Sequence, residues 1–297
     1  MSGLLQLRWE ANAELSAAWA TYVVATGMIC TDEKTEQALV DSAKEINHRL
    51  VTASTDNRRF WTCFLDRCVA GDDADTVVAV SLMNAGCGEL QLEPTAKAIG
   101  SRLGEARHLF FQRFPKLEEQ LPLRFGPLRE RWETIGPGLL REVERQVWQN
   151  SPPNDWWPAA VTVSAVQPIA GGGGGLDPDS DSIWVEAMLT DADPIIPEIL
   201  RVIWLVTSLA IETHIRSRTG ERMMSSAWSL VSVPLVLSAA SHLEMFPPGD
   251  LPIGRAVQIW HGASPETVET LVRWWQEYAA STTPLPLALQ ELEASLT

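Results

Sequence analysis

The chain has 297 residues, of which 45% are hydrophobic and 21% are charged, a balance that supplies a sizeable core and argues against global disorder. The net charge is −15, and residues 151–297 hold six arginines, no lysine and 17 acidic residues. Because clustered lysine and arginine are needed to bind phosphate groups, we expect neither nucleic acid nor an anionic membrane as a partner.

One basic stretch, residues 97–145, runs against this acidic trend. We interpret it as a solvated helix face that pairs with acidic residues of the C-terminal half. A patch for RNA or another anionic partner is the alternative interpretation.

The sequence also bears on where the protein resides. The first residues, MSGLLQLRWE, lack the basic segment and long apolar segment of a secretory signal. The longest apolar runs, 202–211 and 228–240, are shorter than the roughly 20 residues that cross a bilayer. No two of the four cysteines form a closely spaced pair, so we expect reduced thiols and a cytoplasmic location. These cysteines are Cys30, Cys63, Cys68 and Cys87.

Apolar residues recur at helical spacing in several N-terminal segments. Residues 39–50 form one such stripe after a capping Asp32, and residues 99–114 form a second. A third stripe, 128–143, contains the Gly-Pro-Gly sequence at 136–138. We expect this helix to be kinked or split there, because proline lacks an N–H donor and clashes with the preceding turn.

Two segments, 160–166 and 182–189, alternate apolar and polar residues and are rich in β-branched side chains, which predicts strands. Residues 167–181 between them are expected to form a long loop containing five consecutive glycines, 171–175. A phosphate-binding loop would open into a helix and carry a lysine, whereas here a strand follows and no lysine lies beyond Lys116. We therefore expect no nucleotide or other cofactor, and interpret the glycines as a flexible flap or a tolerated insertion.

The segment after Pro197 predicts a helix that is apolar on nearly all sides from 199 to 211, interrupted only by Arg201, Thr207 and Ser208. Such a helix belongs at the centre of a domain. A second apolar helix is expected at 222–242, and Ser264-Pro265-Glu266 predicts the start of a third.

The predicted fold is mainly α with a small β element (α+β), with a two- to few-stranded sheet around residues 160–189. We expect a helical lobe at 1–92 and a second lobe with the sheet at 93–297. One continuous domain is the alternative.

Three carboxylates alternate in the acidic turn, at Asp177, Asp179 and Asp181. Alternate acids can converge on calcium, which makes them weak candidates for a metal site. A calcium loop would have glycine at the position of Ser182 and a bidentate acid at the position of Met188. We therefore favour a solvated turn and predict no metal.

Thirteen tryptophans accompany only two tyrosines. Tryptophan can stack on sugars or anchor a partner protein. Trp132, Trp204 and Trp275 lie on apolar stripes, however, so we favour a role in the core.

The order strand, glycine loop, strand, buried helix resembles the approach to the active-site helix of zinc-dependent peptidases. That helix carries His-Glu-x-x-His, which supplies two metal ligands and a general base. Here the corresponding residues 197–204 read PEILRVIW, and no histidine occurs before His214. The resemblance therefore implies a metal-free relative.

Several stretches also resemble an uncharacterised bacterial family of the planctomycete type. They are GPLRERWETIGPGLL (126–140), GGGGGLDPDSDSIWVEAML (171–189), PEILRVIWLVTSL (197–209), WSLVSVPLVLSAASHLE (228–244) and LVRWWQEY (271–278). The resemblance implies a bacterial cytoplasmic setting. It supplies no activity, cofactor or catalytic residue.

These observations favour a non-enzymatic structural or protein-interaction protein that uses its acidic half or its tryptophans as a contact surface. No catalytic residue is assigned. The alternative is a hydrolase, or a degenerate metallopeptidase-like protein, with a site between strand 182–189 and helix 197–214. Its carboxylates would come from Glu186, Asp191, Asp193 and Glu198.

Overall fold

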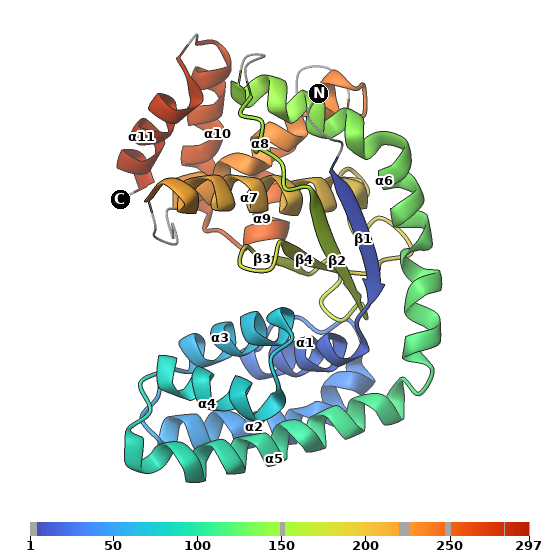
Figure 1. Cartoon of the computed structure of the whole chain (residues 1–297), viewed down its shortest axis with the longest axis vertical. Helices are drawn as coiled ribbons and strands as arrows, with labels where there is room; N and C mark the ends of the chain where they lie inside the picture. Colours follow the sequence, from blue (N-terminus) through green and yellow to red (C-terminus); the bar gives the residue numbers. More distant parts are fainter. Residues whose placement is uncertain (1–4, 149–151, 220–225, 247–250, 282, 297) are drawn as a thin grey trace.

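The computed structural model describes residues 5–148, 152–219, 226–246, 251–281 and 283–296. The chain is mainly helical, at 68%, with one small four-stranded mixed sheet, which confirms the predicted fold class. Figure 1 shows the sheet in the middle of the molecule, between a set of N-terminal helices and a set of C-terminal helices.

The N-terminal elements are β1 (Gln6–Ala11), α1 (Ala13–Thr26), α2 (Glu33–Thr52), α3 (Asn57–Ala70), α4 (Ala74–Asn84), α5 (Glu89–Arg113) and α6 (Leu117–Trp148). The later elements are β2 (Ala160–Val166), β3 (Gly174–Asp177), β4 (Ser182–Glu186), α7 (Glu198–Thr219), α8 (Ser226–His242), α9 (Ile253–His261), α10 (Pro265–Ala279) and α11 (Leu285–Leu296).

Two N-terminal helices confirm the predicted stripes. Asp32 caps α2 by accepting a hydrogen bond from the Lys34 amide, and the stripe from Leu39 to Leu50 is buried. The second stripe lies on α5, which begins at Glu89, so that Pro94 is inside the helix.

Helix α6 is continuous, so the possibility that it splits at residues 136–138 is wrong. Pro122, Pro127 and Pro137 all lie inside it, and Figure 1 shows it bending along one side of the molecule from the N-terminal helices to the C-terminal ones. Gly136 is needed there, because a Cβ atom at this position would lie 2.7 Å from the ring of Trp132. The Trp132 ring therefore covers the helix at the point where a break was expected.

The strand order is β1-β2-β4-β3. Strand β2 pairs in parallel with β1 and with β4, while β3 pairs antiparallel with β4. Strand β2 has the predicted bounds, and β4 ends at Glu186, earlier than the predicted residue 189.

Two strands were not predicted. Strand β1 comes from the start of the chain, outside the region 160–189, and β3 occupies part of the segment expected to be a loop. The all-loop interpretation of 167–181 is therefore wrong. Gly175 of β3 lies so close to Trp184 that a Cβ atom would sit 2.5 Å from the Trp184 Nε1 atom. Glycine lets this short edge strand pair with β4 beneath the indole.

Helix α7 lies in the core of the C-terminal part, as predicted, where it packs with α8 and with residues of α9, α10 and α11. The expected start of the second helix at residue 222 lies outside the described residues. Ser264 caps α10 by accepting a hydrogen bond from the Thr267 amide, and Pro265 is its first residue, which confirms the predicted start. Within the described residues, no helix has both the length and the apolar character needed to span a bilayer.

The tryptophans lie mainly in the core, which supports the favoured interpretation. Eight of the thirteen are buried, and most of them stack or tilt against another aromatic ring. The ring centroids of Trp19 and Trp184 are 4.6 Å apart, and those of Trp204 and Trp260 are 5.2 Å apart.

Arginines of the basic stretch pair with acids from both the N-terminal and the C-terminal half of the chain. Arg113 binds Asp32 of the N-terminal half, and Arg131 binds Asp191 of the C-terminal half. The expected pairing with the acidic half therefore accounts for only part of this stretch.

Candidate functional site

The glycine-rich segment wraps around one buried carboxylate, that of Glu186 at the end of β4. The Glu186 side chain has no exposed surface. Its Oε1 atom accepts hydrogen bonds from the amides of Ile169 and Ala170, and its Oε2 atom accepts from the amides of Gly172 and Gly173, all at 2.6–2.9 Å. Consecutive backbone amides of this kind form an anion-binding nest, and here the anion belongs to the chain itself.

A fifth donor comes from the N-terminal helices. The indole Nε1 of Trp19, on α1, donates to Glu186 Oε1 at 2.7 Å. Burial raises the pKa of Glu186, but the hydrogen bonds from Trp19 and from the loop amides outweigh it, so the pKa lies below its ordinary value. The carboxylate is therefore ionised and fully bound.

Arg201 lies on the other side of the same loop and is 2% exposed. Its Nε atom donates to Glu198 Oε2 at 3.0 Å, and its Nη2 atom donates to the same oxygen and to the carbonyl of Glu186, the latter at 3.1 Å. Its Nη1 atom donates to the carbonyl of Gly173. One guanidinium thus joins helix α7 to both strands at the open end of the β3–β4 pair.

The remaining two acids hold the segment that leads into α7. Asp191 Oδ1 accepts from Arg131 at 2.8 Å and from the Glu198 amide at 2.9 Å. Asp193 Oδ1 accepts from two backbone amides of the following turn, and its Oδ2 atom pairs with Arg255. Burial raises the pKa of Asp193, but these bonds outweigh it, so the pKa is lowered.

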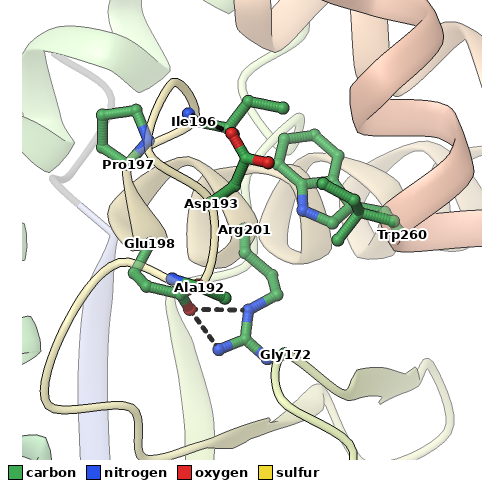
Figure 2. Close-up of a pocket in the computed structure, with 9 residues that line it drawn as sticks. Gly172, Ala192, Asp193, Ile196, Pro197, Glu198, Arg201 and Trp260 are labelled. Atoms are coloured by element: carbon green, nitrogen blue, oxygen red, sulfur yellow. Dashed lines mark hydrogen bonds and ion pairs between the residues drawn. The ribbon is translucent and has the colours of Figure 1, made fainter. Parts of the chain in front are cut away.

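We call this set of side chains the carboxylate clamp, formed by Glu186, Asp191, Asp193, Glu198 and Arg201. Figure 2 shows Asp193, Glu198 and Arg201 around a small pocket that Trp260 also lines. The pocket has a volume of about 10 Å³, roughly the room that one water molecule needs. General acid catalysis by a carboxyl group requires a raised pKa and access to the substrate. Hydrogen bonds from Trp19 and the loop amides lower the pKa of Glu186, and those from Arg255 and the turn amides lower that of Asp193. All four acids of the clamp are bound by other groups of the protein.

The three aspartates of the acidic turn do not gather around a common point in the part of the chain that the structure describes. Asp177 is buried and accepts hydrogen bonds from the Asp179 amide and from the Ser180 hydroxyl. Asp181 adopts a positive φ of 45° at the tight turn between β3 and β4. These contacts give Asp177 a role in shaping the turn.

The histidine of α7, His214, packs against two tryptophans and not against the acids of the clamp. The ring of His214 packs edge-on against Trp148 and Trp156, with centroid distances of 5.4 and 5.5 Å. Across the described ranges, no group of three or more His, Cys, Asp or Glu side chains is placed to hold a metal ion.

A different histidine, His261 at the end of α9, packs edge-on against Trp204 with ring centroids 5.0 Å apart. Burial lowers its pKa from 6.5 to about 4, and a hydrogen bond with the backbone of Ser229 opposes this only in part. His261 is therefore neutral in the folded protein at neutral pH.

We expect acid to destabilise the fold through this residue. The unfolded chain takes up the proton below pH 6.5, whereas the folded protein takes it up only near pH 4, so the free energy of unfolding falls between these values. The loss reaches at most about 3 kcal/mol, and partial solvent contact reduces it. Urea denaturation at neutral pH and near pH 4 should show a steeper decline for the wild type than for His261→Phe. A His48→Gln control, at an exposed position, should retain the wild-type slope; equal slopes in all three proteins would contradict the assignment.

The sequence identified the four acids but not their partners. The signal for Arg201 was present, because a single cation inside a helix that is apolar on all sides must be paired when buried. The run of glycines was a partial indication that the loop could bind Glu186 through its backbone amides. The contact between Trp19 and Glu186 joins residues 167 positions apart, and no local pattern in the sequence indicated it.

Comparison with known proteins adds no relative: no family model, curated protein or solved structure matches this chain.

Proposed function

We propose that this chain is a non-enzymatic structural or protein-interaction protein of the cytoplasm. The observation that carries the proposal is the carboxylate clamp, in which every acid of the candidate site is bound by the protein itself. An acid held in this way stabilises a loop and is not free to exchange protons with a substrate.

The acidic C-terminal half supplies a contact surface for this role. Three glutamates, Glu266, Glu269 and Glu277, and one arginine, Arg273, are exposed along α10, which leaves that face net acidic. The opposite side is anchored in the core by Leu271 and Trp275. A partner with a basic surface would fit this face, because opposite potentials steer association and fix its orientation. The tryptophans are less suited to the role, since most of them are buried.

The hydrolase alternative would need the clamp to open. Asp191 is the most accessible of its four acids, with 33% of its side chain exposed, yet it already binds Arg131 and the first amide of α7. No contact in the described part of the chain favours this alternative over the first.

The test has one readout for each function. Purified protein, with and without added zinc or magnesium, should not turn over chromogenic ester, peptide or phosphomonoester substrates above background. Saturable turnover that Asp191→Asn abolishes, and that the exposed control Asp155→Asn retains, would overturn the proposal.

The second readout is partner capture. A basic protein partner should be retained by the immobilised chain and lost when Glu266, Glu269 and Glu277 are all replaced by glutamine. If the immobilised wild type and the immobilised triple variant recovered every protein equally, the acidic contact surface would be contradicted.

A further inference from the structure

The N-terminal helices enclose a groove that is separate from the clamp. It lies between α1, α3, α4 and α5 and has a volume of about 470 Å³. Pockets that bind small molecules measure roughly 300–1,000 Å³ and are mainly apolar. The floor fits this description, since the buried side chains of Leu15, Phe64 and Val78 line it. These helices form the lower part of the molecule in Figure 1.

Two glycines of α5 keep the groove open. Gly100 and Gly104 line it one helical turn apart, and a Cβ atom built at either position would meet no atom within 4 Å. Glycine inside a helix costs about 1 kcal/mol relative to alanine. Close packing does not require these glycines, but side chains at 100 and 104 would extend into the space that they line.

The charges at the groove are unbalanced towards acid. Arg107 is neutralised by Glu14, with which it forms two hydrogen bonds across the groove from α5 to α1. Asp72 pairs with Arg67. Asp75 is exposed at the groove and takes part in none of the ion pairs formed by the described residues. Among the described residues that line the groove, the charge left without an ion-pair partner is therefore a carboxylate, in a protein of net charge −15.

The one thiol in the groove does not suggest covalent chemistry. Burial raises the pKa of Cys68 to about 12, so the thiol stays protonated at physiological pH. A protonated, partly buried cysteine contributes apolar surface and is a poor nucleophile. The groove is therefore suited to binding.

We propose that this groove binds a small organic cation with an apolar tail, such as an alkylammonium ion. The tail lies on Leu15, Phe64 and Val78, in the space that Gly100 and Gly104 leave open. The ammonium group lies at the mouth beside Asp75. This inference goes beyond the proposed protein-interaction role and does not depend on it.

The test compares three probes with the same tail and different head groups: decylammonium, decanoate and decanol. Calorimetric titration of the full chain below the micelle concentration should show one saturable site that prefers decylammonium. Gly104→Leu should weaken binding at least about tenfold by filling the groove. Asp75→Asn should weaken it about three- to fivefold, as expected for an exposed ion pair.

The control is Gly126→Leu, which makes the same change at a glycine of α6 that also has open space around it but lies outside the groove. It should bind decylammonium as the wild type does. The proposal is overturned by an absence of saturable binding, by decanoate binding as tightly as decylammonium, or by unchanged affinity in Gly104→Leu. The last result would indicate non-specific attraction of cations to an acidic protein. Turnover of the hydrolase substrates would overturn the proposed function and leave this inference intact, because the two tests share no readout.

Discussion

Glu186→Ala is expected to lower the free energy of unfolding by about 4 kcal/mol or more. The substitution leaves four loop amides and the Trp19 indole without the acceptor that they share. A buried donor without a partner costs about 1–3 kcal/mol, and removing one member of a buried charged network typically costs about 3–5 kcal/mol. Urea denaturation followed by tryptophan fluorescence would measure the loss.

The same variant allows a direct test of the nest. The heavy atoms that Glu186→Ala removes are those of acetate, so added acetate should occupy the empty nest and raise the melting temperature of the variant. The wild type, whose nest is filled, should not respond.

The matched control is Glu10→Ala, which removes an exposed carboxylate of the same sheet that accepts one hydrogen bond, from Ser164. It should lose no more than about 1 kcal/mol and show no acetate effect. A Glu186→Ala protein as stable as this control, or one indifferent to acetate, would refute the role assigned to Glu186.

Arg201→Met is expected to destabilise the protein by about 3–5 kcal/mol. Methionine retains much of the apolar stem but removes the donors to Glu198, to the Gly173 carbonyl and to the Glu186 carbonyl. The Glu198 carboxylate would then be buried without its cation, which is the main source of the loss.

Two further variants separate this cause from a simple packing defect. Adding Glu198→Gln to Arg201→Met should recover part of the stability, because the buried uncompensated charge is removed. Arg255→Met, which breaks the ion pair with Asp193, should cost less than Arg201→Met, because Arg255 is 48% exposed and two backbone amides remain bound to Asp193. If the double variant were no more stable than Arg201→Met alone, the ion pair would not be the reason for the loss.

Local patterns in the sequence predicted the elements that depend on local physics. Asp32 before α2 and Ser264-Pro265 before α10 cap their helices, and the alternation of 160–166 gave the bounds of β2. Helical periodicity and capping act within a few residues, so a single sequence contains them.

The errors arose where distant contacts decide the structure. Two of the four residues 174–177 are glycine, so the segment carries little side-chain pattern, and its pairing with β4 makes it a strand. Strand β1 does alternate, with Leu7 and Trp9 partly buried, but its place in the sheet depends on β2. The acids of the candidate site were recognised, whereas the nest that binds Glu186 required knowledge of how the loop folds back.

The parallel pairing of β1 with β2 has a consequence for how the protein folds during synthesis. Gln6 lies opposite Ala160, so about half the chain separates the two strands. Translation at about 5–20 residues per second leaves β1 without its neighbour for roughly 8–30 seconds. Helices α1 to α5, whose contacts are closer in sequence, can form in that interval, while pairing of such distant strands is slow. The N-terminal strand therefore keeps an unpaired edge in the nascent chain until residues 160–166 emerge from the ribosome.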